Sequence, residues 1–379
     1  MPKTKILLIA SFDRSLINFR GDFISELLKQ GFEVLCAAPN FENDIVQKIN
    51  EMGAVAIPIE LQRTGLNPFK DFRTVRQLRK VIKENQIDLV FPYTIKPVIY
   101  GSFAAKRLNV PVISLITGLG LTFSRVSLKY RFLETITTFL YRRALRTNKA
   151  VVFQNDDDRL LFISKKIVKE KQVLEVVHGS GINIDRFEYR TNIKKMEDPI
   201  KFIVVGRMIE SKGILLFIEA AKKLKEEYAQ AEFHLVGMPP KGVTSGLTLT
   251  FLKGLQKEGT IFFHGLQKNV IPVLTSSDVF VLPSFLREGV PRSILEALAI
   301  GLPIITTDMP GCKGTVQKDK NGILIPPKQL DSLVDAMRYF LDNPDRIESM
   351  GKSSRRLAEE KFDVRLINAD LLRIIQDYS

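Results

Sequence analysis

The chain has 379 residues, of which 45 % are hydrophobic and 26 % charged, a composition typical of a soluble globular protein with room for two domains. Its two cysteines, Cys36 and Cys312, are far apart and have no metal-like spacing, which counts against a disulfide scaffold and favours a reducing compartment. The net charge is +14, and residues 1–150 carry +11 of it, with 23 Lys and Arg against 12 Asp and Glu. Such a basic half is expected to meet a polyanionic surface, either nucleic acid or anionic lipid.

No segment has the pattern of a secretory signal or a membrane span. The apolar run after Lys5 ends at Ser11, which is too soon for a signal sequence. No apolar run reaches about 18 residues, the length needed to cross a bilayer. We therefore expect a cytoplasmic protein.

The first half of the chain alternates apolar runs with amphipathic segments. This alternation predicts buried parallel strands joined by helices, and thus a doubly wound α/β domain. No G-x-G-x-x-G follows the first strand, which counts against a dinucleotide oxidoreductase. The predicted strands are 5–12, 32–39, 55–61, 88–94 and 110–120, residues 13–20 are a predicted loop, and the predicted helices are 21–31 and 71–85.

Three residues of this half follow the ends of predicted strands. Lys96 lies just past the strand at 88–94, and Gly118 and Gly120 close the strand at 110–120. Ligands bind at the carboxyl ends of strands in open parallel sheets, and glycine lets the backbone come close to a ligand. The three residues are therefore candidate binding residues, although a plain turn explains the glycines about equally well.

Residues 124–149 form the most basic segment, with seven Lys and Arg against one Glu, a net charge of +6. Apolar side chains recur in it near helical spacing. A basic amphipathic helix with aromatic residues suits an anionic membrane surface. The alternative is that the apolar side chains pack on the domain core, and both can hold together. The apolar positions are Leu128, Phe132, Ile136, Phe139, Leu140 and Leu145.

The run Asp156–Asp158 follows a predicted strand at 150–154 and precedes a predicted helix at 159–168. Three aspartates after a strand resemble a metal-binding Asp-x-Asp motif, but acids also cap and complement a helix start, which is the better interpretation. Residues 173–187 are expected to close the first domain, and 189–199 to be a linker.

A second α/β unit begins with a predicted strand at 201–207. Gly206, Arg207, Lys212 and Gly213 lie on the loop between this strand and a predicted helix at 214–227. Two cations on such a loop can stabilise negative charge that builds on a phosphate, and an ordinary surface pair is the alternative. The remaining predicted elements are strands at 233–240 and 260–267 and helices at 329–341, 345–362 and 364–378.

Residues 279–308 read as a strand, a loop, a helix and a second strand. Pro291 suits the first position of the helix, and Gly301 suits its end. The loop with Glu288 would lie at the carboxyl end of a strand, and the free N–H groups at the helix start favour an anion such as a phosphate. Glu296 follows eight residues later inside the helix.

This unit, with its context EGVPRSILEA, resembles the Glu-x7-Glu signature of retaining glycosyltransferases with the GT-B fold, family four in particular. The Gly-Arg-x4-Lys-Gly pattern at 206–213 resembles the diphosphate clamp of that family. Three further stretches are similar to family elements: Asn-Phe-Arg at 18–20, the SLNPF loop of lipid-linked sugar transferases at 64–69, and the turn at 173–187. One departure is Gly314, where the family usually has a glutamate.

The resemblance implies two Rossmann-like doubly wound domains facing a cleft, at 1–188 and 199–361, with a helix at 362–379 crossing back. Arg207 and Lys212 would stabilise the departing diphosphate, and Glu288 would contact the donor sugar near its reacting end. Glu296 would bind the ribose, and residues near Leu266 the base through backbone groups. The other implied donor contacts are Gly206, Gly289 and Val290, and the implied acceptor contacts are Arg20, Lys96, Gly118 and Gly120.

The implied reaction moves a hexose or N-acetylhexosamine from a UDP-sugar to a sugar on a polyprenyl diphosphate, with retention and without a metal or another cofactor. The implied location is the inner face of the plasma membrane, held through 124–149. A first rival is a GT-B sugar-nucleotide epimerase, which acts on a soluble donor and needs no basic membrane face. A second is a nucleic-acid-binding protein, which basic charge alone suggests and for which no reader motif is present.

Overall fold

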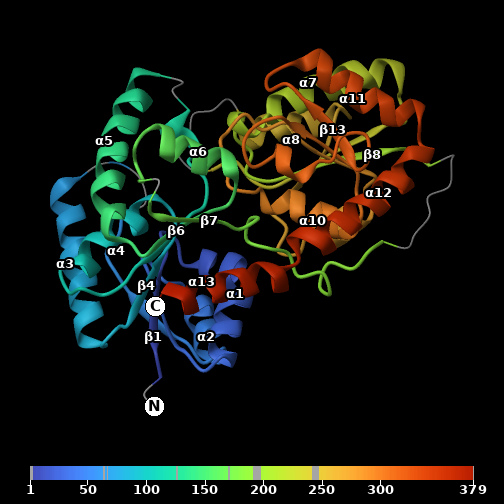
Figure 1. Cartoon of the computed structure of the whole chain (residues 1–379). Helices are drawn as coiled ribbons and strands as arrows, with labels where there is room; N and C mark the ends of the chain where they lie inside the picture. Colours follow the sequence, from blue (N-terminus) through green and yellow to red (C-terminus); the bar gives the residue numbers. More distant parts are fainter. Residues whose placement is uncertain are drawn as a thin grey trace. The chain divides into compact units, whose positions relative to one another are not determined.

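A computed structural model describes residues 3–62, 65, 67–124, 127–169, 171–190, 198–240 and 247–378 (Figure 1). The chain forms two compact units, one of residues 1–181 with 364–379 and one of residues 182–363. The first boundary falls before the residue 188 expected from sequence, because Ile182, Ile184 and Phe187 are buried in the core of the second unit. The second boundary falls at 363/364 rather than 361/362.

The strands of the first unit are all parallel. They form a four-stranded sheet of order β3-β2-β1-β4 and a three-stranded sheet of order β5-β6-β7. Parallel bridges from Val90 to Val112 and from Tyr93 to Leu115 connect β4 with the strand next to it, β5. The bounds are β1 Lys5–Ile9, β2 Glu33–Ala38, β3 Val55–Pro58, β4 Leu89–Pro92, β5 Ile113–Ile116, β6 Ala150–Phe153 and β7 Val173–Val176.

Helices cover both faces of these sheets, as expected for a doubly wound domain. Side chains alternate along a strand, so Leu7 and Ile9 of β1 enter one core with α3, α4 and α5, and Ile6 and Leu8 enter the other with α1, α2 and α13. The C-terminal helix α13 thus belongs to the first unit. The bounds are α1 Arg14–Lys29, α2 Asn43–Glu51, α3 Pro68–Glu84, α4 Ile95–Lys106, α5 Leu128–Ala144, α6 Asp156–Ser164 and α13 Val364–Tyr378.

Two helices of this unit begin where side chains cap them. Asp13 accepts a hydrogen bond from the backbone N–H of Arg14 at 2.7 Å, so α1 starts there, and the prediction of a loop at 13–20 is wrong. Asn155 accepts a hydrogen bond from the N–H of Asp158 at 2.8 Å, and Asp156–Asp158 form the first turn of α6. The interpretation of this acidic run as a helix cap is therefore confirmed.

The second unit is built on one six-stranded parallel sheet of order β10-β9-β8-β11-β12-β13. The chain order reverses between β8 and β11, so the loops that follow these two strands lie next to each other at the carboxyl edge. Ligands bind in open α/β sheets at such a switch point. The bounds are β8 Lys201–Val205, β9 Glu232–Val236, β10 Phe262–Gly265, β11 Val279–Leu282, β12 Ile304–Thr307 and β13 Gly322–Ile325.

Helices of this unit pack against the sheet through apolar faces. The bounds are α7 Ile214–Glu227, α8 Leu249–Lys257, α9 Ile271–Thr275, α10 Arg292–Ile300, α11 Leu330–Asp342 and α12 Asp345–Leu357, with a π-helical turn at Ala358–Phe362. Pro291 caps α10 instead of opening it, and Gly301, at φ +89°, ends it as predicted.

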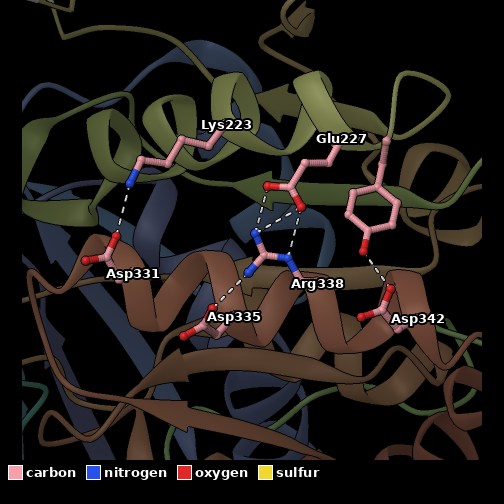
Figure 2. Close-up of polar contacts among 7 residues, drawn as sticks. Lys223, Glu227, Asp331, Asp335, Arg338 and Asp342 are labelled. Atoms are coloured by element: carbon pink, nitrogen blue, oxygen red, sulfur yellow. Dashed lines mark hydrogen bonds and ion pairs between the residues drawn. The ribbon is translucent and has the colours of Figure 1, made fainter.

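Polar pairs join the exposed sides of α7 and α11 (Figure 2). Lys223 lies 3.0 Å from Asp331, and Arg338 bridges Glu227 and Asp335 at 2.9 and 3.0 Å. Exposed pairs of this kind contribute about 0–1 kcal/mol each. The buried face of α11 therefore holds the two helices together, and the pairs add orientation.

None of the helices within the described part of the chain is both long and apolar enough to span a membrane.

Candidate active site

The side chains of Lys212 and Glu288 meet at the switch point of the second unit. Lys212 follows β8 in a short 3₁₀ turn, and Glu288 follows β11 in a loop. The Lys212 ammonium donates to both carboxylate oxygens of Glu288, at 2.8 Å to Oε1 and 2.6 Å to Oε2. The two side chains are only 11 % and 17 % exposed. Topology therefore pairs two residues that are 76 positions apart.

Glycine at 213 permits this approach. Its φ is +75°, and a Cβ there would lie 2.2 Å from the carbonyl oxygen of Pro283. The loop after β8 thus presses directly against the end of β11. Any larger residue at 213 would push the two loops, and with them the ion pair, apart.

Ser284 holds the Glu288 carboxylate from the other side. It is fully buried, and its hydroxyl donates to Glu288 Oε1 at 2.8 Å. The Thr307 hydroxyl of β12 donates to the Ser284 carbonyl at 2.5 Å. Ser284 was not among the residues predicted from sequence; the available signal was its position just after a predicted strand, four residues before Glu288.

The backbone of Glu288 is also fixed, through the loop that follows β12. The Glu288 N–H lies 3.4 Å from the carbonyl oxygen of Pro310. A Cβ on Gly311 would lie 1.9 Å from the carbonyl oxygen of Gly289 and 2.5 Å from that of Glu288. Gly289 is accordingly buried and Val290 half-buried in this loop. Three loops, after β8, β11 and β12, thus define the position of one carboxylate.

Glu296 has a different environment in the first turns of α10. Its side chain is 16 % exposed, and Arg292 Nε lies 3.3 Å from its Oε1. Burial raises the pKa of Glu296 above its ordinary value, although Arg292 and Arg186 both oppose the shift. Loss of hydration therefore outweighs the attraction of two arginines at this carboxylate.

The remaining donor candidates lie at the same edge of the sheet. Gly206 and Arg207 follow β8, where Gly206 is half-buried and Arg207 exposed. Leu266 follows β10 and is 76 % exposed. Gly237 N donates to the Gly265 carbonyl at 2.8 Å, which ties the loops after β9 and β10 together.

In the first unit, the acceptor candidates follow three neighbouring strands. Arg20 lies in α1 after β1, Lys96 in α4 after β4, and Gly118 and Gly120 in the turn after β5. The expectation that Arg20 lies in a loop is wrong, because α1 includes it. Its side chain is 2 % exposed, and its guanidinium lies 5.5 Å from the centre of the Tyr93 ring.

Lys96 has a partner that the sequence analysis did not foresee. Its ammonium lies 3.1 Å from Asp71 Oδ1 at the start of α3 and 5.8 Å from the centre of the Tyr100 ring. Burial, and then the Asp71 carboxylate, raise the pKa of Tyr100. The two glycines have positive φ values of +103° at Gly118 and +55° at Gly120, so the backbone here requires glycine.

Two predicted features fall partly outside the described residues. Of the loop at 64–69, Thr64 and Leu66 lie outside them, as do Arg125 and Val126 of the basic segment. Leu128–Ala144 of that segment form α5, a 3₁₀ turn follows at Leu145–Thr147, and the apolar residues of the segment divide between two sides. Leu140 and Leu145 pack on the core, while three others are exposed: Leu128 at 79 %, Phe132 at 66 % and Phe139 at 51 %.

Residues 185–357 match the family described as glycosyl transferases group 1, and residues 5–155 match the family described as glycosyl transferase 4-like. Together the two matches cover both units of the structure.

The chain is a glycosyltransferase, and each of its two units matches a glycosyltransferase family.

Two relatives of this glycosyltransferase match over most of their length. The N,N'-diacetylbacillosaminyl-diphospho-undecaprenol alpha-1,3-N-acetylgalactosaminyltransferase of Campylobacter jejuni is 26 % identical and covers 95 % of each chain. The UDP-Gal:alpha-D-GlcNAc-diphosphoundecaprenol alpha-1,3-galactosyltransferase of Escherichia coli is 26 % identical and covers 88 % of each. These matches favour neither the epimerase nor the nucleic-acid-binding alternative.

Among solved structures, Anabaena HepE in complex with UDP has a TM-score of 0.77 at 16 % identity, covering 99 % of this glycosyltransferase and all of HepE. A glycosyltransferase from Rickettsia africae has a TM-score of 0.77 at 18 % identity. At such identities the likeness concerns the fold, which is GT-B, as the sequence resemblance implied.

Proposed function

We propose that this glycosyltransferase moves a hexose or N-acetylhexosamine from a UDP-sugar to a sugar linked to a polyprenyl diphosphate. The observation that carries the proposal is the cluster of Lys212, Glu288 and Ser284 at the switch point of the second unit. The names of both relatives supply the substrate classes, since each acts on a diphospho-undecaprenol-linked sugar and one uses UDP-galactose.

The donor would lie along the carboxyl edge of the six-stranded sheet. Lys212 and Arg207 follow β8 and would neutralise the diphosphate as negative charge grows on it. Glu288 would accept a hydrogen bond from a sugar hydroxyl, and Glu296 from the ribose. Gly206, Gly289, Val290 and backbone groups near Leu266 would complete the contacts with the donor.

The proposed reaction retains configuration at the anomeric carbon. The acceptor hydroxyl attacks from the side of the leaving group, so that its oxygen forms the new bond as the bond from the carbon to the phosphate oxygen breaks. The hydroxyl proton passes to the departing diphosphate. Lys212 and Arg207 take the role that a metal ion has in other transferases, so we propose that neither a metal nor another cofactor is needed.

The acceptor would bind the first unit. The proposed acceptor contacts follow the carboxyl ends of three neighbouring strands, where ligands bind in open parallel sheets. They are Lys96 after β4, Gly118 and Gly120 after β5, and Arg20 after β1. The exposed apolar side chains of α5, flanked by arginines, suit an anionic membrane that holds such a lipid. We propose a peripheral position on the inner face of the plasma membrane, with no nucleic acid as partner.

A screen of UDP- and GDP-sugars would test this function. The purified protein is incubated with each donor and a polyprenyl-diphosphate-linked sugar, and released nucleotide and glycosylated lipid are both measured. We expect a UDP-sugar to give product whose new linkage has the donor's anomeric configuration, with full activity in excess EDTA. Inverted product would refute retention, loss of activity in EDTA would refute metal independence, and absence of transfer from any donor would refute the substrate assignment.

A further inference from the structure

The outward side of α5 has two kinds of surface side by side. Leu128, Phe132 and Phe139 recur at helical spacing and form an exposed apolar stripe. Arg131 and Arg142 lie along one flank of the stripe, and Arg143 lies on the other, 5.2 Å over the Phe139 ring. Positions follow from the 100° turn per residue in a helix. An apolar stripe between cations is the pattern of a helix that lies in a membrane interface.

One flank carries a hollow of about 450 Å³ between α5 and the end of α6. Its wall includes side chains of both signs. Among the residues that line it are Arg131, Glu134, Thr138, Phe139, Arg142 and Lys165. Phe139 belongs to both the stripe and the hollow, so a molecule in the hollow would touch the apolar surface as well.

The carboxylate in this hollow is already matched by a cation. Glu134 is 5 % exposed, and Lys165 Nζ lies 2.5 Å from its Oε1. This pair leaves the hollow with the positive charges of Arg131 and Arg142. An anion that enters it therefore meets a net positive charge, despite the glutamate.

The two arginines have different roles in the hollow. Arg142 donates to the backbone carbonyls of Lys166 at 2.8 Å and Lys165 at 2.9 Å, which fixes its guanidinium and ties the end of α6 to α5. The guanidinium of Arg131 makes no hydrogen bond or ion pair to another described residue and is exposed. It is thus available as a bidentate donor for a ligand.

Thr138 adds a neutral hydrogen-bond donor to the hollow. Its hydroxyl oxygen is buried and has no hydrogen-bond partner within the described ranges. A buried hydroxyl without a partner is unfavourable, and an acceptor bound in the hollow would satisfy it. Guanidinium donors beside such a hydroxyl suit an anion with several oxygens.

We propose that this hollow binds the phosphate of an anionic glycerophospholipid headgroup. The inference rests on the membrane association in the proposed function and goes beyond it, because it replaces diffuse attraction by one defined site. The adjacent stripe of Leu128, Phe132 and Phe139 would enter the lipid and bring a headgroup phosphate level with Arg131. The same exposed stripe disfavours nucleic acid, which has no apolar partner for it.

Vesicle binding of matched variants tests the site. Arg131→Gln and Arg143→Gln remove the same charge from the same helix, one beside the hollow and one on the opposite flank. Loss of diffuse attraction weakens binding by roughly fivefold per arginine in each case. Arg131→Gln also removes charge-assisted hydrogen bonds, so we expect it to weaken binding by about a further tenfold or more. Co-sedimentation with vesicles of phosphatidylglycerol and phosphatidylcholine at fixed salt measures both.

Thr138→Val tests the site without a change of charge. We expect about fivefold weaker binding and an unchanged salt dependence, because only one hydrogen bond is lost. Thermal melting followed by circular dichroism checks that each variant is folded. Equal losses in Arg131→Gln and Arg143→Gln, with no effect of Thr138→Val, would overturn the defined site in favour of diffuse attraction.

Soluble phosphates separate a lipid site from a site for a free anion. Glycerol phosphate at millimolar concentration should release the wild type from vesicles more than chloride of equal ionic strength does. Inorganic phosphate that binds as tightly as vesicles, in an Arg131-dependent way, would overturn the lipid assignment. If the wild type does not bind vesicles, both the headgroup site in the hollow and the membrane association are wrong. Transfer to a detergent-solubilised acceptor, assayed on the same variants, tests the proposed transferase function separately.

Discussion

Glu288 and Glu296 belong to one sequence signature, yet the structure gives the two carboxylates opposite surroundings. Glu288 lies in a loop, receives hydrogen bonds from Lys212 and Ser284, and has its backbone fixed by the loop after β12. Glu296 lies in α10 with Arg292 at 3.3 Å, and burial raises its pKa. Glu288 is surrounded by hydrogen-bond donors, whereas the carboxylate of Glu296 is buried and has lost hydration.

The two carboxylates at the start of α10 therefore suit two different functions. A carboxylate between an ammonium and a hydroxyl is held in one orientation, which suits a group that acts on developing charge. A dehydrated carboxylate is a strong acceptor for a hydroxyl pair, which suits recognition of a ribose. Substitutions at these residues and their partners separate the two roles.

Lys212→Ala should have the largest effect. It removes a cation from the proposed diphosphate site and leaves Glu288 without its main partner, so we expect kcat to fall by roughly 10²–10³-fold. Steady-state kinetics with saturating donor measures it. Lys223→Ala, which breaks an exposed pair on α7, is the matched control and should keep full activity. Equal activity of Lys212→Ala and the control would contradict the clamp.

Glu288→Gln keeps the shape of the side chain and removes its charge. We expect a folded protein that binds nucleotide normally and has kcat lowered by at least about a hundredfold, since the charge acts mainly in the transition state. Kinetics and calorimetric titration with UDP measure the two quantities. A variant as active as the wild type would remove Glu288 from the mechanism.

Glu296→Ala should act on binding instead. Loss of a hydrogen bond to a charged group is worth about 1.5–3 kcal/mol, which corresponds to roughly 10–100-fold weaker nucleotide binding. We expect the donor KM to rise by a similar factor while kcat changes little. A fall in kcat at unchanged KM would reverse the roles assigned to the two glutamates.

Ser284→Ala removes the hydroxyl that positions Glu288. The net worth of one hydrogen bond is about 1 kcal/mol, so kcat should fall by about fivefold with little change in the donor KM. Ser276→Ala, at an exposed position of the same unit, is the control. A Ser284→Ala variant that changes only the melting temperature would assign the residue to stability alone.

Glu296→Gln should stabilise the protein at neutral pH. The folded-state pKa of Glu296 lies above its ordinary value of 4.5, so the penalty for keeping it ionised grows as pH rises above that value and is complete above the raised pKa. The gain, on the order of 1 kcal/mol, should be largest above the raised pKa and should vanish as the pH falls to 4.5. Thermal melts across this range measure it.

The same change at the other glutamate should have the opposite sign. Glu288→Gln leaves the buried Lys212 ammonium without its counter-charge, which destabilises the folded state. Melting temperatures of the two glutamine variants at pH 7.5 therefore bracket the wild type. Two shifts in the same direction would show that the environments of the two carboxylates differ less than the structure indicates.

The sequence alone determined the α/β class, the strand order along the chain and the two motifs of the donor site. Apolar runs of strand length, Gly301 at the end of a helix and the acidic start of α6 are local signals, and local signals survive without tertiary information. The start of α1 was not predicted, because the helix is capped by a hydrogen bond from the Arg14 N–H to the Asp13 side chain. This cap lies ahead of the apolar periodicity from which the helix was predicted.

Which of these residues come into contact depends on how the elements pack. Lys212 and Glu288 were predicted in separate roles, and their ion pair arises because β8 and β11 are neighbours at the point where strand order reverses. The pairing of Lys96 with Asp71 and the exposure of Phe132 and Phe139 on α5 also depend on packing between elements. Sequence spacing encodes the faces of one helix or strand, whereas the neighbours of each face are set by the cooperative burial of the whole core.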